Sequence, residues 1–129
     1  MTSFTSQITF LNFRDYDRGR DFMTRVLQLE PLYDIGWAVV YGIAGKAFLG
    51  VVDHSQRPQS PCRDGILISL TADRLEPWYD HVRAFVPVSP IREVPGAGLR
   101  SFFFTGPVGV QFEIQQFLPE NRDACRLFG

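Results

Sequence analysis

The sequence repeats one order of predicted elements, a strand, a helix and three strands, and this repeat limits what the chain can fold into. The apolar run at residues 8–13 is followed closely by an aspartate, and so is the run at residues 66–71, which starts 58 positions later. The helix anchor Phe22 lies 56 positions before Trp78, so a two-residue deletion between strand and helix is expected to align the halves. Because the element order matches over the whole chain, the pattern predicts a duplicated module.

Hydrophobic spacing assigns the elements of each half. Apolar residues recur three or four positions apart over residues 16–29 and 75–85, which predicts two amphipathic helices. Runs of β-favouring residues bounded by Gly, Pro or Asp predict strands at 8–13, 31–35, 37–43 and 46–52, and then at 66–71, 87–94, 99–105 and 110–117. The chain is expected to hold two βαβββ modules, at about 7–53 and 65–118, joined by a polar connector at 54–64.

Composition is that of one globular domain. The chain has 129 residues, of which 45% are hydrophobic and 14% aromatic, enough to build a core. It has 13 basic and 14 acidic residues and no run of Lys or Arg that could follow a phosphate backbone, so nucleic acid is not expected as a partner. Without a secretory leader pattern or an apolar stretch long enough to cross a membrane, the chain is expected in the cytoplasm.

The two cysteines are expected to be free thiols. Cys62 lies in the polar connector and Cys125 near the end of the sequence, without the C-x-x-C spacing of a redox or metal motif. This usage is typical of a reducing compartment. Neither thiol has a neighbouring base in the sequence that would make it a nucleophile.

Three stretches resemble one known family. Residues 15–29, which include the run FMTRVLQL, resemble the helix signature of the vicinal-oxygen-chelate superfamily, whose members include glyoxalase I, bleomycin-resistance proteins and extradiol dioxygenases. Residues 100–114 (RSFFFTGPVGVQFEI) resemble the C-terminal motif of that superfamily. The pair Gly36-Trp37 together with residues 49–53 (LGVVD) resembles small, uncharacterised members.

The resemblance implies an α+β fold in which the two βαβββ modules form a curled mixed sheet. This half-barrel cup has helices on its convex face and a ligand or metal on its concave face. Strand alternation then directs Gln111 and Glu113 into the cup and Phe112 toward the helices. The same rule applied to the first strand leaves three residues facing inward, Ile8, Phe10 and Asn12.

Metal-dependent members of the superfamily hold their ion from four places, one early and one late strand position in each module. Aligning the modules puts Ile8 and Ile66 at the early places and Gly50 opposite Glu113 at the late ones. Isoleucine and glycine side chains carry no donor atom, and one carboxylate cannot fix an ion that normally takes three or more protein ligands. We therefore expect no metal and no cofactor, and Glu113 is the best candidate for a catalytic residue.

The roles of the other polar residues stay open at this point. His54 follows the last strand of the first module and could act as a displaced metal ligand, although a histidine in a polar loop is usually just solvated. His81 lies on the flank of the second helix, as a boundary histidine would. Glu113 could be a general base, could hydrogen-bond a ligand, or could form a structural pair with Arg100.

Aromatic side chains supply the expected ligand surface. Trp37 and Tyr41 share one strand face and Phe102 lies on another strand, an arrangement that also occurs in ordinary cores. Cupped aromatic surfaces bind planar apolar molecules well. The predicted ligand-binding residues are Phe10, Asn12, Trp37, Tyr41, Phe102, Gln111 and Glu113.

These features predict a metal-independent protein that sequesters or senses a planar or amphipathic small molecule. A homodimer is expected, because exposed sheet edges need covering and cyclic dimers are the commonest oligomers. One alternative is a metal-dependent lyase, isomerase or dioxygenase with His54 and Glu113 as displaced ligands. The other is a subunit or regulatory module whose tightly packed cup serves only association.

Overall fold

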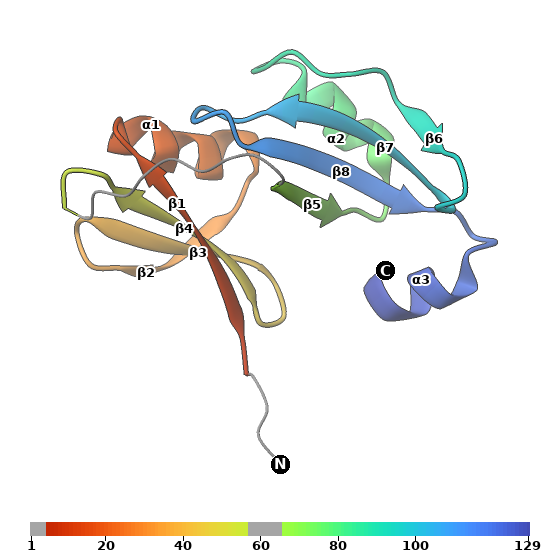
Figure 1. The fold of residues 1–129 in the computed structure, drawn as a ribbon, viewed down its shortest axis with the longest axis horizontal. Coiled ribbons are helices and arrows are strands. Elements are labelled where there is room, and N and C mark those ends of the chain that lie inside the picture. Colours follow the sequence, from red (N-terminus) through yellow and green to blue (C-terminus); the bar gives the residue numbers. More distant parts are fainter. Residues whose placement is uncertain (1–4, 57–65) are drawn as a thin grey trace. The chain divides into compact units, whose positions relative to one another are not determined.

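Two compact units make up the chain. The computed structural model describes residues 5–56 and 66–129. Unit 1 is Met1–Cys62 and unit 2 is Arg63–Gly129, and each contains the predicted order of a strand, a helix and three strands (Figure 1). The two predicted βαβββ modules are therefore confirmed. Cys62 and most of the predicted connector lie outside the described residues.

Unit 1 holds a four-stranded sheet in the order β1-β4-β3-β2. Strands β1 and β4, the first and last of the unit along the chain, are neighbours in the sheet and run parallel. The other neighbouring pairs are antiparallel. Its elements are β1 (Gln7–Phe13), α1 (Tyr16–Asp21), a π-helical turn η1 (Phe22–Val26), β2 (Glu30–Asp34), β3 (Ala38–Ala44) and β4 (Ala47–Asp53).

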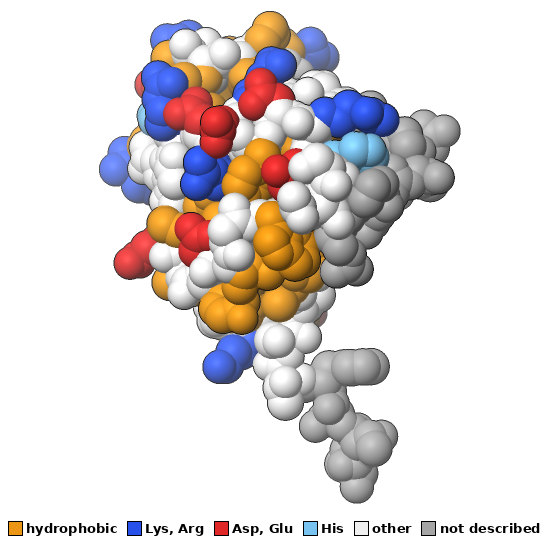
Figure 2. All heavy atoms as spheres, turned by 90° about the vertical axis from the view of Figure 1, so that its left-hand side faces the viewer, with side chains coloured by type: hydrophobic (Ala, Val, Ile, Leu, Met, Phe, Trp, Pro, Cys, Tyr) orange, Lys and Arg blue, Asp and Glu red, His pale blue; other side chains and the backbone are white. Residues whose placement is uncertain are grey.

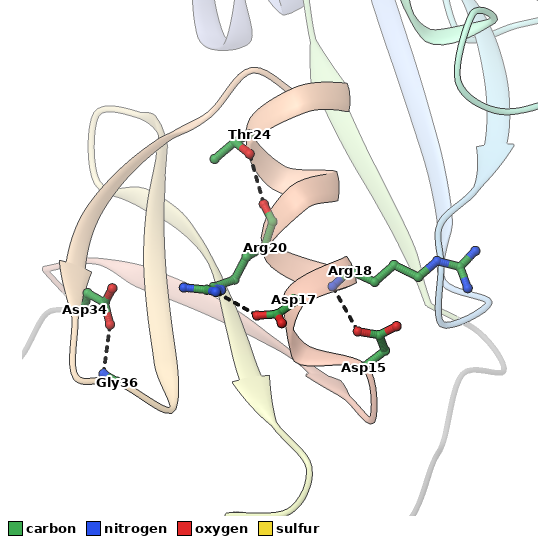
Figure 3. Close-up of polar contacts among 7 residues, drawn as sticks. All are labelled: Asp15, Asp17, Arg18, Arg20, Thr24, Asp34 and Gly36. Carbon is green, nitrogen blue, oxygen red and sulfur yellow. Dashed lines mark hydrogen bonds and ion pairs between the residues drawn. The ribbon is translucent and has the colours of Figure 1, made fainter.

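Helix α1 begins where the sequence provides a cap. The side chain of Asp15 accepts a hydrogen bond from the backbone N–H of Arg18 at 3.1 Å, and Asp17 pairs with Arg20 at 2.7 Å (Figure 3). Gly19 faces the sheet, where a Cβ would come within 2.6 Å of the Phe13 ring. The helix can approach the sheet closely only because this residue is glycine.

The first helix is shorter than predicted. It widens into η1, where the backbone N–H of Leu27 donates to the carbonyl oxygen of Phe22 at 3.1 Å, and the predicted extension to residue 29 is wrong. Gln28 takes a left-handed conformation with φ of 54°, which ends a helix. Glycine or asparagine normally marks that position, so no local stop signal is present at Gln28.

Unit 2 repeats the arrangement with a sheet in the order β5-β8-β7-β6, in which β5 and β8 run parallel. Its elements are β5 (Leu67–Thr71), α2 (Leu75–Val82), β6 (Arg92–Val94), β7 (Leu99–Thr105), β8 (Gln111–Phe117) and α3 (Arg122–Phe128).

Two predictions for unit 2 need correction. The strand expected at 87–94 is only three residues long, because Pro87 and Pro90 have no N–H to donate to a ladder. Ser89 instead exchanges two hydrogen bonds with Phe103: its N–H donates to the Phe103 carbonyl at 2.9 Å, and its hydroxyl oxygen accepts from the Phe103 N–H at 2.8 Å. Helix α3 was not predicted at all, although Asn121 caps it by accepting from the N–H of Ala124 at 3.3 Å.

In each unit, one face of the sheet packs on its helix. Leu11 and Phe13 are buried on that face in unit 1. In unit 2, Phe102 is fully buried and meets the ring of Tyr79 on α2 edge-on, with 5.3 Å between centroids. Within residues 5–56 and 66–129, no helix is both long and apolar enough to span a membrane. Because α1 and α2 each cover one face of their sheet, the opposite sheet faces are where a site can form.

Candidate functional site

Unit 1 contains an apolar hollow on the sheet face that α1 does not cover. Its volume is about 190 Å³. The side chains that line it come from all four strands of the unit and from the β2–β3 turn: Phe10, Tyr33, Ile35, Trp37, Ala38, Val40 and Val52. We call this feature the unit 1 hollow.

Strand register explains the floor of the hollow. Phe10 pairs with Gly50, and Gly50 pairs with Val40, while Val52 pairs with Ala38. Residues paired across neighbouring strands point to the same side of a sheet, so these side chains share one face. Gly50 has no side chain, and the Phe10 ring lies over it where a Cβ would otherwise be.

The β2–β3 turn builds the opposite wall. The side chain of Asp34 accepts a hydrogen bond from the N–H of Gly36 at 2.8 Å, and Gly36 has a φ of 94° (Figure 3). This left-handed residue turns the chain between Ile35 and Trp37, which both line the hollow. The carbonyl of Trp37 accepts from the N–H of Asp53 at 2.9 Å and ties the turn to β4.

Much of the wall is exposed. Phe10 is 53% exposed, Tyr33 is 65% exposed and Ile35 is 43% exposed, whereas Trp37 is half-buried. Figure 2 shows that hydrophobic side chains also gather into a patch near the centre of one face of the molecule. Large exposed apolar side chains that surround a concavity are typical of binding surfaces.

A polar pair stands beside the hollow. Nδ1 of His54 lies 2.6 Å from Oδ1 of Asn12, and both side chains are half-buried. Asn12 pairs in register with Val52, which lines the hollow. The N–H of His54 donates to the Phe13 carbonyl at 2.8 Å, which fixes the backbone that carries the imidazole.

Of the predicted aromatic residues, two line the hollow and two do not. Phe10 and Trp37 lie in its wall. Tyr41 is 2% exposed on the helix-covered face, where burial raises the pKa of its hydroxyl and Asp34 raises it further against the opposing effect of Arg20. Phe102 packs on Tyr79 of α2. The prediction that Tyr41 and Phe102 line a cup is therefore wrong.

The reason lies at the start of β3. Trp37 and Tyr41 are separated by an even number of positions, which gives them the same face in a regular strand. Strand β3 begins only at Ala38, and Trp37 belongs to the preceding turn, so alternation does not reach it. The sequence also missed Tyr33, because the pairing of β2 shifts between Pro31 and Tyr33.

Unit 2 presents a polar counterpart on the sheet face that α2 does not cover. Glu113 is 7% exposed, and its Oε1 accepts a hydrogen bond from the Ser69 hydroxyl at 2.6 Å. Gln111 is exposed and donates through Nε2 to Oγ1 of Thr105 at 2.8 Å. Within the described residues, two predicted ligand contacts of unit 2, Gln111 and Glu113, therefore form hydrogen bonds with neighbouring side chains.

Arg100 is not the partner of Glu113. Its Nη2 donates to Oε1 of Glu76 at 2.6 Å and to Oε1 of Gln116 at 3.1 Å. Gln116 also accepts from the N–H of Leu75 at the start of α2, so this cluster lies on the helix-covered face. The alternative of a Glu113–Arg100 pair is therefore excluded.

The predicted alignment of the two modules is displaced by one residue in β5. Ser69 shares the face of Glu113, and strand alternation gives that face to Leu67 and Thr71 rather than to Ile66, which precedes β5. The prediction that Ile66 points inward is therefore wrong. Three pairs of corresponding residues lie 59 positions apart, namely Ile8 and Leu67, Tyr16 and Leu75, and the buried Met23 and Val82, so no deletion is needed.

The donor set does not fit a catalytic metal. In unit 1, Ile8 offers no donor atom and the Gly50 position is covered by the Phe10 ring. At the corresponding places of unit 2, Leu67 offers no donor atom, and the carboxylate of Glu113 already accepts from Ser69. The parts of the chain that the structure describes hold no group of three or more His, Cys, Asp and Glu side chains that could bind an ion.

The overall structure is similar to several solved structures at low sequence identity. A glyoxalase/bleomycin resistance protein/dioxygenase from Nocardioides is 17% identical, with a TM-score of 0.73 over 92% of this chain and 87% of that one. A lactoylglutathione lyase from Agrobacterium tumefaciens is 21% identical, with a TM-score of 0.66 over 85% and 91% of the two chains.

The fosfomycin resistance protein FosX from Listeria monocytogenes is 16% identical, with a TM-score of 0.68 over 95% of this chain and 99% of that one. No protein-family model and no curated protein sequence matches the chain. The chain has the fold of the glyoxalase/bleomycin resistance/dioxygenase superfamily, the vicinal-oxygen-chelate fold that its sequence motifs resemble.

Proposed function

We propose that this chain is a cytosolic binding protein that holds a small apolar or amphipathic molecule in the unit 1 hollow without a metal ion. The observation that carries the proposal is the hollow itself, which is lined by aliphatic and aromatic side chains. Covering such a surface with a planar apolar molecule removes apolar area from water, which is favourable for binding. Sequestration or sensing needs no bond to be broken.

The size of the hollow limits the ligand. Its volume is about 190 Å³, and an engineered apolar cavity of about 150 Å³ binds benzene. One aromatic ring with a short substituent therefore fits, with Phe10 and Trp37 as flanking rings. A hollow of this kind also argues against the alternative of a tightly packed cup that serves only association.

The fold similarity supports handling of a small molecule but does not identify it. The similar structures include a fosfomycin resistance protein and a lactoylglutathione lyase. These names describe activities of those proteins. Shared fold alone does not transfer an activity. The proposal for this chain rests on the lining of its own hollow.

The test is a titration of the protein with toluene, measured by isothermal titration calorimetry. Ala38→Leu places three carbons in the floor of the hollow and is expected to weaken toluene binding at least tenfold. Ala44→Leu on the same strand is the matched control, because Ala44 is exposed and does not line the hollow, and it should leave affinity unchanged. Equal toluene binding by both variants would contradict the proposal.

Truncation of the aromatic wall gives a second test. Trp37→Ala should weaken toluene binding by about 1–3 kcal/mol, by analogy with stacking of bases on aromatic side chains. Thermal unfolding of the same variant serves as its control. Loss of the folded state would show that Trp37 is a core residue rather than a ligand contact.

We also propose that the chain forms a homodimer. Strand β2 is an edge strand, and its exposed Leu32 and Tyr33 are 57% and 65% accessible. Exposed apolar edge strands are usually covered in the assembled protein. Light scattering at micromolar concentration should give twice the 14.7 kDa chain mass, and a purely monomeric mass would exclude the dimer.

A further inference from the structure

The Asn12–His54 pair lies at the border of the unit 1 hollow. Across the sheet, Asn12 pairs with Val52 and Val52 pairs with Ala38, and these two partners form part of the hollow's floor. Along β1, Asn12 is two residues from Phe10 and so shares its face. The bond between the two side chains brings His54 to that face as well.

The contact with Asn12 sets the tautomer of His54. Nδ1 lies 2.6 Å from Oδ1 of Asn12, and an amide carbonyl oxygen can only accept. Nδ1 therefore carries the proton and donates it to Asn12. In the neutral imidazole the remaining nitrogen, Nε2, then has a lone pair and acts as a hydrogen-bond acceptor.

We propose that His54 Nε2 is the polar recognition group of the unit 1 hollow, and that the ligand is a small aromatic ring carrying a hydroxyl, with phenol as the simplest case. This inference rests on the proposed function, because it places the ring among Phe10, Trp37 and Val40. Asn12 is a positioning residue that selects, in the neutral ring, the tautomer with its lone pair on Nε2.

The distinction between a hydroxyl and a methyl group follows from desolvation. Toluene and phenol have nearly the same shape, but the phenol hydroxyl loses its water on entering an apolar site. Without a partner, this loss weakens binding by about tenfold or more. A hollow that offers an acceptor restores the lost hydrogen bond, and phenol then binds about as well as toluene.

The experiment compares phenol and toluene by calorimetry on the unmodified full chain, on two variants of His54 and on Asn12→Leu. In the unmodified chain the two affinities should agree within about threefold. His54→Leu should weaken phenol about tenfold and leave toluene unchanged, and His54→Gln, whose amide oxygen can accept, should recover part of the loss. An unchanged phenol affinity in His54→Leu would overturn the inference.

The role of Asn12 has a readout that does not depend on ligand affinity. In protein labelled with ¹⁵N-histidine, His54 Nδ1 should show the shift of a protonated ring nitrogen and Nε2 that of an unprotonated one. Asn12→Leu should mix the two tautomers and weaken phenol but not toluene. The signals of His54 are identified as those missing from His54→Gln. A protonated Nε2 in the unmodified neutral ring would overturn the inference.

The two failures are distinguishable. If neither toluene nor phenol binds, both the proposed function and this inference are wrong. If toluene binds and is blocked by Ala38→Leu while phenol does not bind, the hollow is a ligand site without a hydroxyl acceptor, and only the inference about His54 fails.

Discussion

The ring of Phe10 on β1 lies over Gly50 on β4, in the space that a Cβ at position 50 would occupy. The two residues are cross-strand partners in a parallel pair. This contact closes one side of the unit 1 hollow, and it depends on the absence of a side chain from Gly50.

Gly50→Ala should therefore destabilise the protein by about 1–3 kcal/mol, because the added methyl group overlaps the ring and forces it to move. Urea denaturation measures the change. Phe10→Ala in the same chain should remove most of this penalty, so the double variant is expected to be more stable than the sum of the single effects indicates. Additive effects would show that the ring and the glycine are not coupled.

The buried carboxylate of Glu113 should depend on Ser69. Ser69→Ala removes the hydroxyl that donates to Oε1 and should cost about 1–3 kcal/mol of unfolding free energy. Thr71→Ala is a matched control two positions along the same strand, where Thr71 only accepts an exposed bond from Gln115, and it should change stability by less than about 0.5 kcal/mol. Similar losses in both variants would contradict a special role for the Ser69 contact.

Acid sensitivity is expected at Glu76. The hydrogen bond from Arg100, aided by a backbone hydrogen bond, holds the pKa of Glu76 below its ordinary value of 4.5. A carboxyl group with a lowered folded pKa stabilises the protein above the unfolded value, and this contribution is lost as pH falls from about 4.5 through the folded value. Glu76→Gln should therefore lower stability at pH 7 and flatten its decline in acid.

The measurement is urea denaturation of both proteins between pH 7 and pH 3. Arg100→Met provides the control background, because Glu76→Gln should have little further effect once its main partner is gone. An unchanged acid profile in Glu76→Gln would show that the Arg100 contact does not contribute to stability.

Metal content can be tested directly. Because Ile8 and Gly50 supply no donor and Glu113 is engaged by Ser69, protein expressed with added Zn²⁺, Ni²⁺, Mn²⁺ or Fe²⁺ should contain far less than one ion per chain. Elemental analysis after gel filtration measures this ratio. One ion per chain that disappears in Glu113→Ala would restore the metal-dependent alternative.

Sequence reasoning predicted the order of elements along the chain well, because β-favouring runs between Gly, Pro and Asp are strong local signals. Strand β7 was predicted with its observed bounds, Leu99–Thr105. The end of α1 could not be predicted, since it depends on a left-handed Gln28 that no local propensity indicates. The local signal for helix α3 is the cap residue Asn121, which precedes a helix of only seven residues.

The candidate site was harder to predict than the fold, because one position along a strand decides which face a side chain takes. Phe10 and Asn12 were given the correct face, since β1 is regular. Tyr41 was misplaced because the regular alternation of β3 was extended into the turn at Trp37. The contact between Asn12 and His54 joins residues 42 positions apart, and sequence patterns contain no signal for such a pair.

The covering of Gly50 by Phe10 also constrains the mutational routes open to this chain. Position 50 in unit 1 corresponds to Glu113 in unit 2, since Phe10–Gly50 and Ser69–Glu113 are equivalent pairs of the parallel strands. A glycine codon can become a glutamate codon by one nucleotide change, yet the new side chain would collide with the ring. A smaller residue 10 has to come first, so the order of the two substitutions decides whether unit 1 can acquire a carboxylate there.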